Sequence, residues 1–303
     1  MDFLKDYDFP QSLRVKDPAE VNRKLSKIKE DTLGSLQVIT DFDYTFSKYH
    51  DGNGKRLVSS WGILEKSPVF PDSFREKCLA LFNKYHPYEV DPSLTVEEKT
   101  PFIAEWYTKL IELITVYITD AELVKKALDG SARVELRDGV SDFVSRLYES
   151  HIPLLIFSAG FGELIKNLMT SRGLMDSSLT RIHSNFLEFD PSSGKVLGIK
   201  EPVVHVFNKN GGSYLETLSP AGRESLTSRK NVFLLGDSLG DLSMSKGIFE
   251  ESTESSTTVL KIGFLNHDIE AYMESYTSQY DIVVLDDQTM NLPLHILKLI
   301  ETK

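Results

Sequence analysis

The pattern of apolar and polar positions predicts a helix and then a buried strand near the start of the chain. Apolar residues recur at helical intervals within Asp17–Leu33, as on an amphipathic helix. The following run, Leu36–Thr40, is short and β-favouring, and it ends abruptly in Asp41-Phe42-Asp43. We therefore expect a buried strand with two acids at its carboxyl end.

The pattern changes between Lys48 and Arg137, where helical periodicity dominates. The second predicted helix opens with Thr95-Val96-Glu97-Glu98, which is close to a capping box. Pro101 falls in its first two turns, so a break or a later start is also compatible with the sequence. The predicted helices of this segment are Asp72–Tyr85, Thr95–Tyr117 and Asp120–Leu128.

Strand and helix patterns alternate after Arg137. The predicted helices are Asp138–Ser150 and Phe161–Arg172, and a hairpin is expected around residues 190–194. The predicted strands are Pro153–Phe157, Thr180–His183, Asn231–Leu235, Lys261–Phe264 and Asp281–Leu285, the last two each followed by a helical pattern. This alternation indicates an α/β fold, a Rossmann-like parallel sheet covered on both faces. We expect residues 1–48 and 138–303 to form the core domain and residues 49–137 an inserted helical cap.

Composition narrows the class of partner. The chain has 303 residues, 41% of them hydrophobic, with 34 basic and 45 acidic residues and a net charge of -11. This balance argues against binding to nucleic-acid polymers or anionic membranes, both of which need clustered Lys and Arg. There is a single cysteine, Cys78, and neither a signal-peptide pattern nor a membrane-length apolar run. We expect a cytoplasmic monomer that binds a small molecule.

The clearest chemical signal is Asp41-Phe42-Asp43-Tyr44-Thr45 at the end of the first strand. Two carboxylates two positions apart can face one site if the chain turns there, and their mutual repulsion calls for a cation. Carboxylate oxygens are ligands that Mg²⁺ prefers. An acidic loop without a role is the alternative interpretation of this motif alone.

A second acid pair, Asp237 and Asp241, lies in Gly236-Asp237-Ser238-Leu239-Gly240-Asp241 directly after another apolar strand. Strand ends of a parallel sheet meet at one edge, so this pair can supply the remaining metal ligand. A solvated turn is the alternative, because Gly, Asp and Ser are common turn residues.

Two further residues are candidates for holding a phosphate. Ser158 ends a predicted strand at a predicted helix start, where its hydroxyl and the following backbone N–H of Ala159 can contact phosphate oxygens. Taken alone, Ser158 is more often a helix N-cap. Lys209 lies in a loop, where a lone lysine is usually a surface residue. It is a candidate because of its position along the chain relative to the other three motifs.

Together, the four motifs resemble the haloacid dehalogenase superfamily of phosphohydrolases over nearly the whole chain. The resemblance implies that Asp41 is the nucleophile and Asp43 the general acid and base. It also implies that Ser158 and Lys209 bind phosphate. Mg²⁺ is then expected to be held by Asp41, Asp237 and the carbonyl of Asp43, with Asp241 and Thr45 in supporting roles.

Longer strings narrow the resemblance. Tyr88-Glu89-Val90-Asp91-Pro92, Glu105-Trp106-Tyr107-Thr108-Lys109 and His205-Val206-Phe207-Asn208-Lys209 are similar to those of cytosolic 5'-nucleotidase III, the pyrimidine 5'-nucleotidase family. The resemblance implies Mg²⁺ dependence and nucleoside 5'-monophosphate substrates. It places Glu89 against the base, where a carboxylate accepts hydrogen bonds from the cytosine N4 amine or from the N1 and N2 groups of 7-methylguanine.

Tyr107 is the informative difference within that family. A branch that prefers 7-methylguanosine monophosphate tends to carry tryptophan there, the best ring face for a cationic base. The sequence therefore favours CMP and UMP, with 7-methyl-GMP as the alternative. Two other activities stay open: a nucleoside phosphotransferase and a non-catalytic nucleotide-binding protein. For Trp106, ordinary packing of a long helix is the favoured interpretation.

Overall fold

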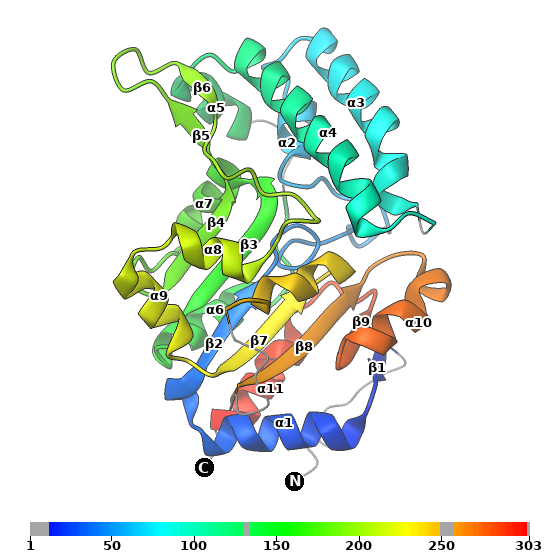
Figure 1. The fold of residues 1–303 in the computed structure, drawn as a ribbon, viewed down its shortest axis with the longest axis vertical. Helices are drawn as coiled ribbons and strands as arrows, with labels where there is room; N and C mark the ends of the chain where they lie inside the picture. Colours follow the sequence, from blue (N-terminus) through cyan, green and yellow to red (C-terminus); the bar gives the residue numbers. More distant parts are fainter. Residues whose placement is uncertain (1–11, 92, 130–133, 249–256, 302–303) are drawn as a thin grey trace.

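The computed structural model describes residues 12–91, 93–129, 134–248 and 257–301. Its centre is a seven-stranded sheet with the order β1-β9-β8-β7-β2-β3-β4, in which only β1 is antiparallel to its neighbour (Figure 1). The strands are β1 Leu13–Val15, β2 Leu36–Thr40, β3 Leu154–Phe161, β4 Thr180–Asn185, β7 Asn231–Gly236, β8 Thr258–Leu265 and β9 Ile282–Leu285. The expected α/β class with a mostly parallel sheet is confirmed.

Helices cover both faces of this sheet. One hydrophobic cluster joins the sheet to α1, α6, α7 and α11, and a second cluster joins the opposite face to α8, α9 and α10. In Figure 1, α8, α9 and α10 lie in front of the sheet and α11 lies behind it. The helices are α1 Pro18–Glu30, α6 Val140–Glu149, α7 Gly162–Ser171, α8 Gly211–Thr217, α9 Pro220–Thr227, α10 Ile269–Gln279 and α11 Asn291–Glu301.

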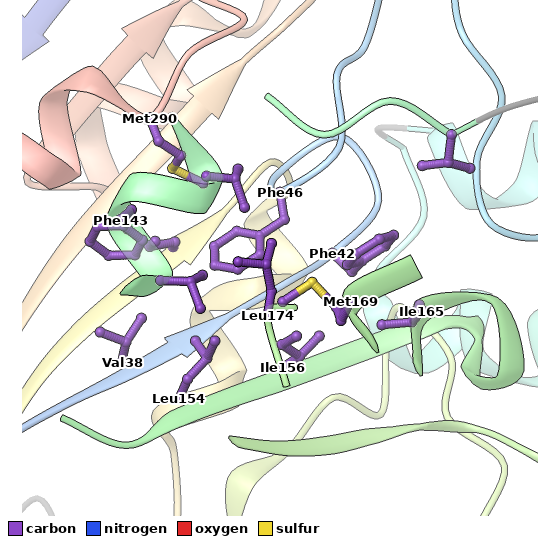
Figure 2. Packing of buried hydrophobic residues seen from close by; sticks show 14 of the residues in the cluster. Val38, Phe42, Phe46, Phe143, Leu154, Ile156, Ile165, Met169, Leu174 and Met290 are labelled. Atoms are coloured by element: carbon purple, nitrogen blue, oxygen red, sulfur yellow. The ribbon is translucent and has the colours of Figure 1, made fainter. Parts of the chain in front are cut away.

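Strand periodicity decides which side chain enters which cluster. Successive residues of a strand point to opposite faces, so Val38 belongs to the first cluster and Ile39 to the second. Figure 2 shows the first cluster, where Phe42 and Phe46 from the loop after β2 pack with α6 and α7 residues such as Phe143 and Met169. Burying both sheet faces explains why the inner strands are continuous apolar runs.

The order of connections creates a switch point at β2. From β2 the chain passes to β3 and β4 on one side, and later to β7, β8 and β9 on the other. In open parallel sheets, ligands bind beyond the carboxyl ends of the strands at such a point. The loops after β2 and β7 lie there.

A helical segment is inserted between β2 and β3 and lies above this edge of the sheet (Figure 1). Its helices are α2 Gly62–Lys66, α3 Asp72–Val90, α4 Val96–Tyr117 and α5 Ala121–Leu128. The antiparallel hairpin β5 Leu187–Phe189 and β6 Val196–Ile199 packs on α4, with the N–H of Val196 donating to the Thr119 carbonyl at 3.1 Å. A piece of chain from the second half thus joins the inserted helices.

The inserted segment confirms one predicted helix and extends another. Helix α4 agrees with the predicted Thr95–Tyr117 and runs unbroken through Pro101, with the Thr95–Glu98 capping box starting it before the proline. Helix α3 continues past Tyr85 through Pro87 to Val90. Proline has no N–H, so the carbonyl of Asn83 lacks its helical hydrogen bond. Both residues are exposed, so water can bond that carbonyl instead. The short strand β1 and the helices α2, α8 and α9 lack a prediction.

Candidate active site

The ends of two neighbouring strands bring the first acids together. Asp41 follows β2 and Asp237 follows β7, and Thr40 is paired in register with Leu235. Oxygens of Asp41, Asp237 and Asp241 all lie within 4.8 Å of one another. The parallel pairing of β2 and β7 therefore gathers acids that are about two hundred residues apart in the sequence.

Lys209 bonds two acids of this group. Its Nζ donates to Asp41 Oδ1 at 2.5 Å and to Asp241 Oδ1 at 2.7 Å, and all three side chains are buried. Burial disfavours the ammonium charge, but the two carboxylates outweigh this effect and raise the pKa of Lys209. The lysine is therefore charged at neutral pH and is not a surface residue.

The acids carry more negative charge than one lysine offsets. Burial raises the pKa of Asp41 to about 7, against the opposing effect of Lys209. Burial and the nearby Asp41 and Asp241 carboxylates raise the pKa of Asp237 well above its ordinary range. Clustered buried carboxylates of this kind call for a cation, and an all-oxygen donor set suits Mg²⁺. The residues present fit a magnesium ion.

The loop after β7 is fixed by its own acid. Asp241 Oδ2 accepts from the backbone N–H of Asp237 at 3.1 Å, and from the N–H and hydroxyl of Ser238 at 2.9 Å each. The short 3₁₀ helix Leu239–Ser245 begins here, with Ser238 and Asp241 forming a capping box. Asp241 thus supports both the loop that carries Asp237 and the amine of Lys209.

Asp43 points to a different partner from the other acids. Its carboxylate accepts from the backbone N–H of Ser60 at 2.7 Å and from the Ser60 hydroxyl at 2.6 Å. The Ser60 oxygen in turn accepts from the N–H of Phe161 at 2.9 Å. Burial raises the pKa of Asp43, while the two Ser60 bonds oppose that shift. A carboxyl of raised pKa is suited to exchanging protons near neutral pH.

The structure corrects the local setting of Ser158. Strand β3 continues to Phe161, with an irregular register after Phe157, so Ser158 is not an N-cap and α7 starts later, at Gly162. Its hydroxyl accepts from the N–H of Gly160 at 2.9 Å. The N–H groups of Gly160 and Phe161 are therefore already engaged within the protein.

Gly160 is a position where the site excludes any side chain. A Cβ there would lie 2.2 Å from Ser60 Oγ, 2.7 Å from Asp43 Oδ2 and 2.9 Å from Ser158 Oγ. Three polar side chains from separate segments therefore meet against this bare backbone position.

Thr45 lies under the loop rather than in the acid cluster. It is fully buried, and its hydroxyl has no hydrogen-bond partner. The carbonyls of Tyr44 and Thr45 accept from the buried guanidinium of Arg137 at 2.6 and 2.8 Å. Tyr44 has a φ of 63°, a strained value for a residue with a side chain, and these bonds help to hold it.

The inserted helices contact the site through Tyr107. Its hydroxyl donates to the Ala159 carbonyl at 3.2 Å, and that oxygen also accepts from Trp61 Nε1 at 2.9 Å and Asn185 Nδ2 at 2.8 Å. Glu89 is half-buried near the end of α3, and burial raises its pKa despite the nearby Lys99. The site and the inserted helices therefore meet at the Ala159 peptide.

Trp106 is a packing residue, as its sequence context favoured. Its ring stacks on buried Tyr85 with centroids 6.2 Å apart and meets Phe82 edge-on at 6.0 Å. These contacts hold α4 against α3.

Sequence reasoning missed Ser60, Gly160 and Arg137. Ser60 bonds Asp43, and Arg137 bonds carbonyls of the loop after β2. Both contacts join residues far apart in the sequence, so neither residue had a local signal. Gly160 stood inside the Ser158-Ala159-Gly160 string, where a glycine following a candidate phosphate ligand was a usable hint.

Comparison with known proteins identifies the family. The family model described as Pyrimidine 5'-nucleotidase (UMPH-1) matches residues 44–301. The chain belongs to the pyrimidine 5'-nucleotidase family. It is therefore an enzyme, a 5'-nucleotidase of the hydrolase class.

Curated relatives match along almost the full chain. The 7-methylguanosine phosphate-specific 5'-nucleotidase A of Xenopus laevis is 33% identical, covering 96% of this chain and 97% of its own. The Homo sapiens protein named 7-methylguanosine phosphate-specific 5'-nucleotidase is 34% identical, covering 92% of this chain and 89% of its own.

A solved structure of similar sequence has the same fold. The crystal structure of cytosolic 5'-nucleotidase IIIB bound to cytidine has a TM-score of 0.81 and 31% identity, and the match covers 96% of this chain and 94% of that one.

Over the described residues, every helix is too short or too polar to span a bilayer.

Proposed function

We propose that this 5'-nucleotidase hydrolyses nucleoside 5'-monophosphates with Mg²⁺, using Asp41 as the nucleophile. The observation that carries the proposal is the buried contact of Asp41 with Lys209 at 2.5 Å, beside the carboxylate of Asp237. A nucleophilic carboxylate needs a neighbouring positive charge to approach an anionic phosphate, and Lys209 provides one.

Asp41, Asp237 and the main-chain carbonyl of Asp43 would hold the Mg²⁺. Bound there, the ion would offset negative charge on the equatorial phosphate oxygens during transfer. Asp241 already bonds Lys209 and the loop after β7, so we assign it to orientation of these groups.

The reaction follows in two steps. Asp41 attacks phosphorus in line, and the bond from phosphorus to the ester oxygen breaks as Asp43 gives that oxygen a proton. Asp43 then takes a proton from a water that attacks the aspartyl-phosphate, which releases inorganic phosphate and restores Asp41. Ser158, the Ala159 N–H and Lys209 hold the phosphate oxygens throughout. The raised pKa of Asp43 favours its role in both proton transfers.

Two observations bear on the base. The relatives named for 7-methylguanosine phosphate favour 7-methyl-GMP, and the similar structure bound to cytidine favours CMP. We propose that Glu89 accepts hydrogen bonds from either base and that Tyr107, in place of the larger tryptophan ring, shifts preference toward CMP and UMP. The half-buried setting of Glu89 supports a role in recognition, because a buried carboxylate needs partners.

The test is phosphate release from CMP, UMP, GMP and 7-methyl-GMP at equal concentrations with Mg²⁺. We expect release from the wild type and none from Asp41→Asn, in which the nucleophile is lost and the shape retained. Activity of Asp41→Asn near the wild-type level would refute the mechanism. Equal rates on all four substrates would refute the roles of Glu89 and Tyr107 but not that of Asp41.

We further propose that the enzyme is cytoplasmic and monomeric. A relative named putative cytosolic 5'-nucleotidase 3 from Caenorhabditis elegans, 32% identical over 96% of this chain, supports the first point. Sedimentation of the purified chain tests the second.

A further inference from the structure

Tyr276 of α10 and Tyr280, the C-cap of that helix, contact the loop that carries Asp237. The Tyr276 hydroxyl donates to the Asp237 carbonyl at 2.5 Å, and the Tyr280 hydroxyl donates to the Ser238 carbonyl at 2.5 Å. Tyr276 lies in α10 and Tyr280 is its C-cap, four residues on, so both rings extend from the same side of the helix. The carbonyls of the adjacent residues Asp237 and Ser238 thus accept hydrogen bonds from tyrosines one turn apart at the end of α10.

The sheet is shaped to admit Tyr280. Gly263 of β8 is paired in register with Gly236 of β7, the residue directly before Asp237. A Cβ on Gly263 would lie 2.7 Å from the Tyr280 ring, so only glycine lets the ring lie this close to the strand. Tyr280 is fully buried and stacks on Tyr276 with centroids 5.7 Å apart.

In the loop after β7, both the backbone N–H groups and the backbone carbonyls of two adjacent residues are hydrogen-bonded. Asp241 accepts from the N–H groups of Asp237 and Ser238, while the tyrosines donate to the carbonyls of the same two residues. With both neighbouring peptides held, the backbone that bears the Asp237 carboxylate has a single orientation.

We propose that Tyr276 and Tyr280 are positioning residues that orient Asp237 for the divalent cation. This inference rests on the proposed function, in which Asp237 is a metal ligand. Removing a group that orients a metal ligand typically lowers metal affinity by about 10- to 100-fold. Neither tyrosine is assigned a contact with substrate, so the substitutions should weaken metal binding more than the chemical step.

The test measures metal binding without substrate. Mn²⁺, which takes the same oxygen ligands as Mg²⁺, is titrated into the metal-free full chain, and its unbound fraction is read by electron paramagnetic resonance. The variants are Tyr276→Phe and Tyr280→Phe, each lacking a single oxygen. Tyr272→Phe is the matched control, since Tyr272 lies one turn earlier on the same helix, is 38% exposed and makes no hydrogen bond to the loop.

We expect the Mn²⁺ dissociation constant to rise about 10-fold or more in each of the two variants, and to stay unchanged in Tyr272→Phe. The kcat measured at saturating Mg²⁺ should return close to the wild-type value, which a general loss of structure would not permit. Dissociation constants equal to that of Tyr272→Phe would overturn the inference. A wild type that binds no Mn²⁺ would overturn the proposed metal site as well, so the two failures are distinguishable.

Discussion

Replacing Gly160 with alanine places a methyl group where three polar side chains of the site meet. The added Cβ would lie 2.2 Å from Ser60 Oγ, about 1.2 Å short of the 3.4 Å at which ordinary contact begins. Ser60 or the β3 backbone must therefore move by about 1 Å. Since Ser60 makes both hydrogen bonds to the Asp43 carboxylate, that carboxylate moves with it.

A misplacement of about 1 Å in a catalytic site costs about 100-fold in rate, while overpacking a buried position costs about 1–3 kcal/mol of folding free energy. We therefore expect Gly160→Ala to remain folded and to lose about 100-fold in kcat. Steady-state phosphate release measures the first effect, and urea denaturation followed by circular dichroism measures the second.

Gly52→Ala is the matched control for this substitution. A Cβ at Gly52 meets no atom within 4 Å, and its φ lies outside the left-handed region, so the same methyl group enters open space. The control should keep wild-type activity. A Gly160→Ala enzyme within threefold or so of the wild-type kcat would refute the reasoning, because the geometry leaves no room for the methyl group without displacement.

Three further predictions concern charge and local stability. Lys209→Met leaves Asp41 and Asp241 buried without their cation, so we expect a loss of about 3–5 kcal/mol in unfolding free energy without Mg²⁺; an unchanged urea midpoint would contradict this. Burial lowers the pKa of His183 from 6.5 to about 4. At pH 5 the imidazole is therefore protonated in the unfolded chain but not in the folded one, so the folding stability decreases as the pH is lowered. His183→Gln should therefore lose about 2 kcal/mol less than the wild type between pH 7 and pH 5, and equal losses would refute the assignment. Thr95→Ala removes one bond of the α4 capping box and should cost about 1 kcal/mol with activity retained; hydrogen exchange should place the loss at the start of α4.

The strands that carry the acids could be predicted from the sequence because their signals are local. Leu36–Thr40 is predicted with its observed bounds, since a buried parallel strand is an apolar run that ends where the acids begin. The capping-box sequence at Thr95 predicts the start of α4 even though Pro101 follows closely. Neighbouring residues alone specify both features.

The contacts that complete the site are not local and had no such signal. Ser60 reaches Asp43 only because the segment before α2 crosses the end of β3, and Tyr280 reaches Ser238 because Gly263 leaves space beside it. The same is true of the hairpin β5–β6, whose turn is predicted while its packing on α4 is not. Tertiary packing decides these placements.

The most direct test of the account is to trap the intermediate on Asp41. The enzyme is mixed with CMP or 7-methyl-GMP and Mg²⁺, quenched during turnover and treated with borohydride, which reduces an acyl phosphate to the alcohol but leaves a free carboxylate intact. Peptide mass spectrometry should then find Asp41 converted to homoserine when substrate is present and unchanged when it is absent. Homoserine at another aspartate, together with phosphate release by Asp41→Asn, would contradict the account.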